Sequence, residues 1–282
     1  MGSGSRSLTR GEEMHALKFA PALTIAALVT ACGEKANPAG PSSPAGPTVA
    51  SLVISGADYV LAGSTTAYTA TATLSDGSTR TVAAAWSSSA VNVATADNAG
   101  RLEGRAHGVT MLTAAHDGRS ASKTVHVVNN YGGSWSGRYI VRACRDSGIF
   151  TDGIYGGSYV DVPWCRALNS VGSEHSFAFA LVQTGSDYSE IRATFGTNGE
   201  QFSGMVTADG RLRLEGTSKV LDWYGDHWGN VQLREWDTNF DASSGMTGRW
   251  AQTLTMIGQQ GSAYEEVELV RMSRTATTLV SR

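Results

Sequence analysis

The sequence predicts an all-β protein, in which a β-sandwich is followed by an antiparallel, eight-stranded up-and-down β-barrel. Glycine is abundant, at 33 residues, and helical periodicity is nowhere sustained. Short runs rich in Thr, Val and Ser alternate at period two between turn residues, which is typical of half-buried strands. The chain exceeds the length of one typical domain, so we expect two β-domains after the N-terminal segment.

Residues 1–31 have the organisation of a signal peptide. Residues 19–31 form an apolar run that is too short to span a bilayer, and Lys18 precedes it, as in a cleavable secretory signal. Met14 is an alternative start, because it leaves a short basic segment before the apolar run. The fold of the mature protein is therefore expected to begin after this region.

Cys32 follows Leu28-Val29-Thr30-Ala31, and the block resembles the lipobox of bacterial lipoproteins. In that family the thiol receives a diacylglyceryl group and becomes the new N-terminus, so the resemblance implies that Cys32 is lipidated. A plain signal peptide with an incidental cysteine is the alternative. Residues 32–48 are rich in Pro, Gly and Ser and are expected to form a flexible linker.

The lipobox resemblance also implies where the protein is located. We expect a lipid-anchored protein of the bacterial cell envelope. The residue after Cys32 is Gly33 and not Asp, which in bacterial lipoproteins implies a location at the outer membrane or cell surface. No later segment approaches 18 consecutive apolar residues, so the lipid is the expected contact with the membrane.

Residues 49–128 alternate between short strands and turns, with about seven strands expected, which favours a β-sandwich. The segment resembles a bacterial Ig-like domain of group 2, a module found in surface adhesins, and the resemblance implies a spacer or weak adhesion role without catalytic residues. Trp86 is expected to fill the core, and the glycines to supply turns with positive φ. The residues that carry the resemblance are Leu61-Ala62-Gly63-Ser64, Trp86-Ser87-Ser88-Ser89, Val93-Ala94-Thr95, Gly100, Gly104, Gly108, Thr110 and Thr113-Ala114.

Residues 129–282 form the second predicted domain, in which eight strand-like runs close most naturally into a barrel because closure removes exposed edges. An open sandwich is the alternative. The motif Trp135-Ser136-Gly137-Arg138-Tyr139 resembles the opening strand of lipocalin-like barrels, and Asp209-Gly210 is a hairpin signal. On the first strand we expect Trp135, Gly137, Tyr139, Val141 and Ala143 to share one face. The other runs are 175–183, 187–195, 201–207, 211–220, 228–237, 246–257 and 264–272.

Cys144 and Cys165 are the two cysteines left once Cys32 is lipidated. An even pair in an exported domain predicts a disulfide, which closes a loop of about 20 residues and stabilises the fold by roughly 3 kcal/mol. Two free buried thiols are the alternative.

Two aromatic stretches of the second domain are too irregular to be plain strands. Flat aromatic faces beside fixed polar groups suit a glycan or a small amphipathic ligand. The alternative is that these aromatics plug the end of the barrel. The expected ligand-binding residues are Tyr155 and Tyr159 in the first stretch and Trp223, Tyr224, Asp226, His227 and Trp228 in the second.

Several functional classes are disfavoured. A net charge of −3 argues against nucleic acid as a partner. Asp222, Asp226 and His227 form only a weak metal motif, so no metal and no cofactor are expected. No H-E-x-x-H, G-x-S-x-G or phosphate-loop motif is present, and no catalytic residue is expected.

The sequence therefore favours a non-enzymatic surface binding or adhesion module, with the Ig-like domain as a spacer and the barrel as the ligand-binding part. The alternative is a glycan-acting hydrolase with a carboxylate pair at the barrel mouth. The acidic pairs Glu235/Asp237 and Glu266/Glu268 each lie on one face of a strand, and a solvated outer wall is the favoured interpretation of both.

Overall fold

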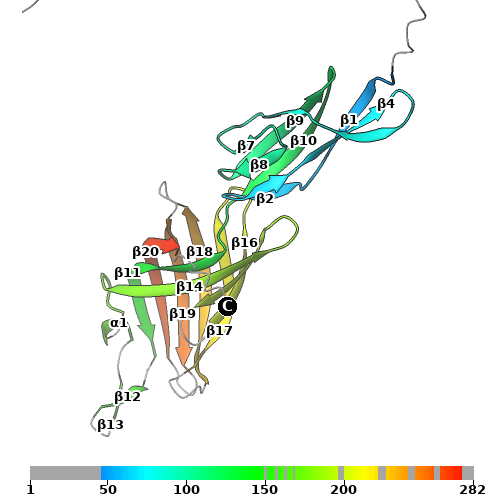
Figure 1. Ribbon diagram of the computed structural model, residues 1–282. Helices are drawn as coiled ribbons and strands as arrows, with labels where there is room; N and C mark the ends of the chain where they lie inside the picture. The colour runs from blue at the N-terminus through cyan, green and yellow to red at the C-terminus, as the bar shows by residue number, and fades with distance from the viewer. Residues whose placement is uncertain are drawn as a thin grey trace, which may run out of the picture. The chain divides into compact units, whose positions relative to one another are not determined.

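The structure is a computed structural model that describes residues 46–148, 151–155, 158–161, 164–167, 169–195, 200–221, 227–240, 245–256 and 261–274. These residues form strands almost throughout, with one short helix (Figure 1). Strands before residue 129 build three small sheets, and eight of the later strands build a closed barrel, which confirms the predicted fold class.

The first set of strands forms sheets of order β1-β4-β5, β2-β10-β9-β6 and β3-β8-β7. The described residues contain ten strands here, against about seven expected, and the additional ones include β2 and β3 between residues 59 and 67. The strands are β1 (Val49–Ser55), β2 (Tyr59–Leu61), β3 (Thr65–Ala67), β4 (Thr69–Leu74), β5 (Thr79–Val82), β6 (Ala85–Ser88), β7 (Ala94–Ala96), β8 (Arg101–Gly104), β9 (Gly108–His116) and β10 (Arg119–Val128).

The core of this first set is built around Tyr68, Leu102 and Leu112, which are at most 2% exposed. Trp86, expected to fill the core, is only partly buried and packs against its edge. Gly100 has φ +76°, and a Cβ there would lie 2.5 Å from the Tyr68 carbonyl oxygen, so this turn requires glycine.

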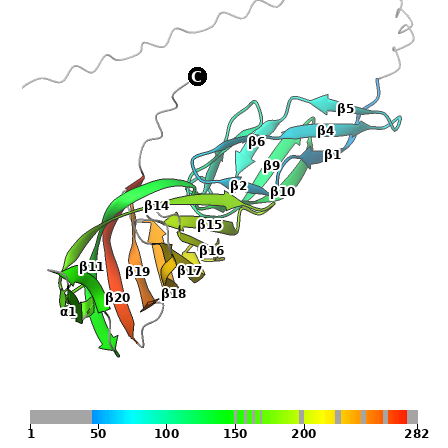
Figure 2. The ribbon, with the colours of Figure 1, turned by 90° about the horizontal axis from the view of Figure 1, so that it is seen from below.

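The barrel has the strand order β11-β14-β15-β16-β17-β18-β19-β20 and closes by antiparallel pairing of β20 with β11 (Figure 2). The turn before β17 contains Gly210 at φ +80°, which confirms the predicted hairpin. The barrel strands are β11 (Gly133–Ser147), β14 (Glu174–Thr184), β15 (Glu190–Phe195), β16 (Glu200–Val206), β17 (Leu212–Leu221), β18 (His227–Phe240), β19 (Met246–Met256) and β20 (Ser262–Arg274).

Two of the register shifts in the barrel change which side chains face inward. On β18 the register slips between Arg234 and Asp237, where Glu235 has φ +53°, so Trp236 is buried while Glu235 is exposed. On β11 the register slips between Val141 and Ala143. The expectation that Ala143 continues the inward face is therefore wrong, because Cys144 takes that place and packs against the core.

Aromatic side chains fill the middle of the barrel. Trp236 stacks on Trp250 with ring centroids 4.8 Å apart, and Phe177, Phe179 and Phe195 contact one another at 5.2–5.3 Å. Interior residues of an eight-stranded barrel commonly pack into a core, and these rings do so here. The described interior is thus a stabilising core.

Tyr131, in the connection between β10 and β11, closes one end of the barrel. It is 0% exposed, stacks on Phe240 at 4.6 Å, and donates a hydrogen bond to the Gly210 carbonyl oxygen at 2.8 Å. Burial raises the pKa of its hydroxyl. The side chain therefore ties the start of the barrel to the β16–β17 turn.

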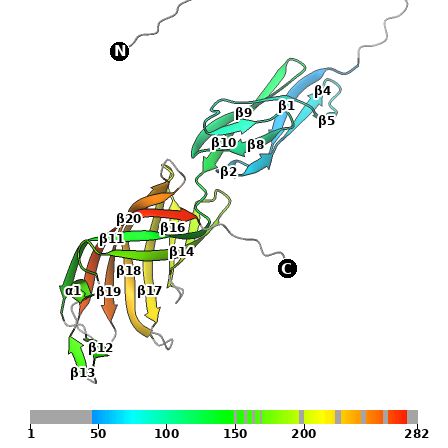
Figure 3. The same cartoon turned by 60° about the vertical axis from the view of Figure 1, so that its left-hand side comes forward.

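The long connection between β11 and β14 contains β12 (Thr151–Tyr155), β13 (Ser158–Asp161) and α1 (Trp164–Ala167). Figure 3 shows α1 beside β11. Cys144 and Cys165 are bonded, with Cα atoms 5.4 Å apart, which confirms the predicted disulfide. The bridge holds α1 against the barrel wall.

Candidate functional site

The structure describes the predicted aromatic site only in part. Trp223, Tyr224 and Asp226 lie outside the described residues, as does Cys32. His227 begins β18, is exposed, and its Nε2 lies 3.1 Å from the Asn230 side-chain oxygen. The proposed ligand-binding role of these residues therefore remains a prediction.

Tyr155 and Tyr159 belong to the β12–β13 hairpin, where Tyr159 pairs with Ile154, and their side chains, like that of Trp228, lie outside the description. In an up-and-down barrel alternate connections lie at the same end. The β11–β14 and β17–β18 connections are therefore at one end, which we call the α1 end. At this end β17 finishes at Leu221 and β18 begins at His227, and the β12–β13 hairpin belongs to the connection that leaves β11 there.

Glu265 is the buried carboxylate among the described residues, at 1% exposure, and it points into the barrel near the α1 end. Its Oε1 accepts hydrogen bonds from Trp164 Nε1 and from Asn169 Nδ2, the latter at 2.5 Å. Its Oε2 accepts from Gln252 Nε2 at 2.8 Å. Two of these donors come from the α1 region and one from β19, so Glu265 fastens α1 over the interior.

Sequence reasoning did not identify Glu265. It lies between Tyr264 and Glu266, and a run of polar residues conceals its inward register position. The sequence signal that could have identified it is its position: it lies two residues from Ala263 and two from Val267, on the same face of the strand, and all three residues are buried. A buried charge is stable when hydrogen bonds satisfy it, as the three donors do here.

Tyr139 lies close to this network. Its ring makes an edge contact with Trp250, with centroids 5.3 Å apart, and stacks on His175 at 5.2 Å. Burial, and secondarily the negative charge of Glu265, raise the pKa of the Tyr139 hydroxyl to about 12. The α1 end thus combines a buried carboxylate with an aromatic wall.

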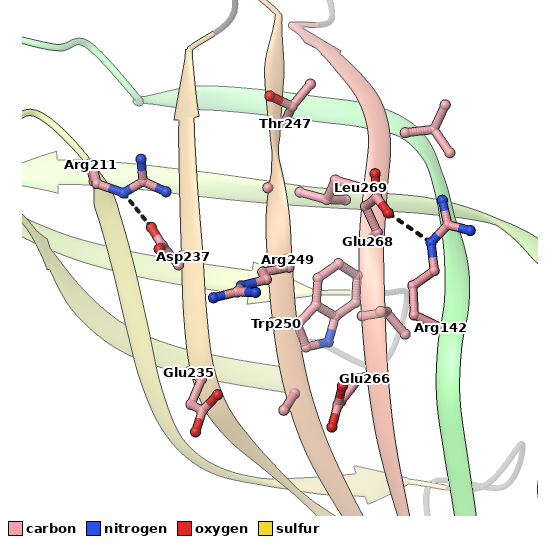
Figure 4. A pocket seen from close by; sticks show the side chains of 14 residues that line it. Arg142, Arg211, Glu235, Asp237, Thr247, Arg249, Trp250, Glu266, Glu268 and Leu269 are labelled. Atoms are coloured by element: carbon pink, nitrogen blue, oxygen red, sulfur yellow. Dashed lines mark hydrogen bonds and ion pairs between the residues drawn. The ribbon is translucent and has the colours of Figure 1, made fainter.

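A second candidate site is a groove of about 740 Å³ on the outer wall of the barrel, formed by β18, β19, β20, Arg142 of β11 and Arg211, which directly precedes β17 (Figure 4). We call it the outer-wall groove. Its floor includes the short residues Gly248 and Ala251. Longer charged side chains rise around them, from Arg142, Arg211, Glu235, Asp237, Arg249, Glu266 and Glu268.

Charges of alternating sign cross the groove along neighbouring strands. Asp237 accepts from Arg211 Nε at 2.5 Å and lies 3.2 Å from an Arg213 terminal nitrogen. On the opposite side Glu268 accepts from Arg142 Nε at 2.7 Å. The Asp237 hydrogen bond raises the pKa of Arg211.

Arg249 lies between these pairs, opposite Asp237 on one neighbouring strand and Glu268 on the other (Figure 4). Its side chain is exposed, and within the described part of the chain it forms no ion pair or hydrogen bond. The groove is lined by three arginines, Arg142, Arg211 and Arg249, against four carboxylates, Glu235, Asp237, Glu266 and Glu268. The central cation is the one available to a ligand.

The acidic pairs of the sequence meet in this groove rather than at the barrel mouth, and both lie on the outer wall as expected. Asp237 and Glu268 are held by arginines. Glu266 lies 4.0 Å from Arg145 and accepts from the Tyr264 hydroxyl at 3.2 Å. The convergence of these residues depends on barrel closure and on the β18 bulge.

Among the described residues, no group of three or more His, Cys, Asp or Glu side chains is arranged to hold a metal ion. In the same ranges, no helix has the length and apolar character needed to cross a bilayer.

No protein-family model matches the chain, and no curated protein is significantly similar to it. Among solved structures, the chain is similar to domains 5–6 of the S-layer protein SbsC, with 14% identity, 78% of this chain and 97% of that chain covered, and a TM-score of 0.27. A structure of SbsC domains 4–9 gives 14% identity, coverage of 78% and 31%, and a TM-score of 0.28. The S-layer protein rSbsC(31–844) is 11% identical, with 82% of this chain and 38% of that chain covered and a TM-score of 0.26. TM-scores this low support no inference about this chain.

Proposed function

We propose that this chain is a lipid-anchored, non-enzymatic binding protein of the bacterial cell envelope, with the Ig-like segment as a spacer and the barrel as the binding part. The block that ends at Cys32 resembles a lipobox, and this resemblance supports export and anchoring. The observation that carries the binding role is the outer-wall groove, because its central Arg249 is exposed and, within the described ranges, has no partner.

The barrel interior offers less support for a ligand site. Its middle is packed with aromatic rings, and its ends are covered by Tyr131 and by α1 with Trp164. The predicted aromatic residues at the α1 end remain a prediction for a second contact region.

Glycan hydrolysis is the weaker proposal. Glycoside hydrolases use two carboxyl groups that flank the bond to be broken, one of them a proton donor whose pKa burial raises. Glu265 is surrounded by hydrogen-bond donors, while Asp237 and Glu268 are bound by arginines. The remaining pair, Glu235 and Glu266, is exposed on an open wall.

The binding role is tested with the purified full-length protein on a panel of neutral glycans, acidic glycans, peptides and lipids. Arg249→Glu should abolish retention of at least one class of ligand, while Arg192→Glu should not. Arg192 is the matched control, because it is an exposed arginine of the outer wall on β15. Equal retention by both variants and the unmodified protein would reject the groove as the binding surface. Release of new reducing ends from a glycan would favour the hydrolase.

The anchor is tested separately. Cys32→Ser should move the protein from the membrane fraction to the supernatant and abolish incorporation of labelled fatty acid, since a thiol is the acceptor of the lipid. Labelled fatty acid on the variant would contradict the proposal.

A further inference from the structure

We infer that the outer-wall groove binds a zwitterionic ligand, a short peptide whose free ammonium and free carboxylate are separated by the length of a dipeptide. The inference rests on the proposed function and names the ligand class for the same groove. Its basis is that, among the described residues, the groove leaves one charge of each sign without an ion pair. These two residues are Arg249 and Glu235 (Figure 4).

The other charges of the groove are neutralised by neighbours on the barrel wall. A paired guanidinium and carboxylate present little net charge to a ligand, so the groove suits neither an anionic nor a cationic polymer. A ligand that carries both charges meets Arg249 with its carboxylate and Glu235 with its ammonium, and both contacts are attractive. The ion pairs join Asp237 to Arg211 and Arg213, Glu268 to Arg142, and Glu266 to Arg145.

The negative end of the groove lies on both sides of Ala251, a small residue of β19. Glu266 pairs in register with Ala251 on one side, and Glu235 is exposed at the β18 bulge on the other. Burial raises the pKa of the Tyr264 hydroxyl, and the charges of Glu266 and Glu235 raise it further, so both carboxylates act on the same point. An ionised carboxylate has about four acceptor positions, so Glu266 can accept from a ligand as well as from Tyr264.

The positive end lies two residues along the same strand, at Arg249, which Figure 4 shows above Glu235 and Glu266. Two residues of an antiparallel strand span about 6.8 Å. An extended dipeptide has almost the same length, since each residue adds at most about 3.6 Å. The ammonium and carboxylate of a single amino acid are attached to one carbon and are too close together to reach both ends. The planar fork of Arg249 suits the carboxylate of the ligand.

The test compares three dipeptides that differ only in their terminal charges: dialanine, N-acetyl-dialanine, which lacks the ammonium, and dialanine amide, which lacks the carboxylate. Each is titrated into the full-length protein and followed by NMR. Dialanine should bind about tenfold more tightly than either blocked peptide, because each block removes a charge-assisted contact. High salt should weaken the binding of dialanine, since both ends of the groove are exposed.

Substitutions assign each ligand charge to one side chain. Arg249→Ala should bind dialanine and its amide equally, whereas Glu235→Gln should bind dialanine and its acetyl derivative equally. Arg249→Lys should keep part of the preference for the free carboxylate, because the charge remains but the planar fork is lost. The control variants are Arg192→Ala and Glu190→Gln, at exposed positions of β15, and both should bind as the unmodified protein does.

The blocked peptides also decide between the competing ligand classes. Tighter binding of N-acetyl-dialanine would overturn the inference in favour of an anionic ligand, and tighter binding of the amide would do so in favour of a cationic one. Equal binding of all three peptides would show that the groove does not recognise charge, and would overturn it as well. Binding of none of them would overturn this inference alone, since the ligand panel tests the binding role independently.

Discussion

The inner and outer walls of the barrel differ in chemistry although the same strands build both. On β19, Trp250 is buried in the aromatic core while its neighbour Arg249 is exposed. On β20, Glu265 is buried beneath α1 while Glu266 faces the groove. Successive side chains of a strand point to opposite faces. One step along the chain therefore separates residues that hold the barrel together from residues exposed on its outer wall.

The aromatic core should show the largest effect on stability. Trp236 is 1% exposed, and its indole nitrogen donates to the Thr238 hydroxyl at 3.0 Å. Trp236→Ala should lower the free energy of unfolding by about 3–5 kcal/mol, because it leaves a cavity among the rings. Urea unfolding measures the loss. Val182→Ala, at an outer-wall position that is 57% exposed, is the control and should stay within about 0.5 kcal/mol of the unmodified protein. Similar losses in both variants would refute the distinction between the walls.

Glu265 and Glu266 are adjacent residues that face opposite walls, so substitutions at these two positions compare the walls directly. Glu265→Ala should destabilise the protein by about 3 kcal/mol, because the buried donors of Asn169, Gln252 and Trp164 lose their acceptor. Glu265→Gln should cost less, since one oxygen remains. Glu266→Ala should change the free energy of unfolding by less than about 0.5 kcal/mol. A harmless Glu265→Ala would mean that this carboxylate does not fasten α1.

The ionisation of Tyr139 should have a smaller effect on the free energy of unfolding, and this effect should depend on pH. Its pKa in the folded protein is about 12, against an ordinary value of 10.0. The unfolded chain therefore loses this proton at lower pH, and the contribution of Tyr139 to stability should fall as the pH rises from about 10 to 12. Tyr139→Phe should reduce the fall without abolishing it, because burial also raises the pKa of Tyr68 to about 12.

Unfolding midpoints between pH 9 and pH 12 provide this measurement. Glu265→Gln should lower the pKa of Tyr139, because the negative charge that helps to raise it is removed. Identical pH profiles of Tyr139→Phe and the unmodified protein would show that this hydroxyl is not buried in the fold.

The fold was predictable because period-two alternation is local. The eight expected runs of residues 129–282 became the eight barrel strands, and Cys144 and Cys165 paired as expected. The bulges were not predictable, since an inserted residue such as Glu235 leaves no signal in composition. They decide that Trp236 and Cys144 face the core.

The outer-wall groove was less predictable than the fold. Both acidic pairs were expected on an outer wall, but the approach of Arg142 to Glu268 requires that the first and last strands pair. Arg249 stands out only when the partners of its neighbours are known. Sequence reasoning therefore found the charged wall but not the groove or its unpaired cation.

The most direct test of the difference between the walls measures retention on the ligand panel and the urea midpoint on the same preparations of Arg249→Ala and Trp250→Ala. These neighbours on β19 face opposite walls of the barrel. Arg249→Ala should lose at least about tenfold in affinity while its midpoint stays unchanged, and Trp250→Ala should lose about 3–5 kcal/mol of stability. An Arg249→Ala protein that binds normally, or that unfolds as readily as Trp250→Ala, would contradict the account.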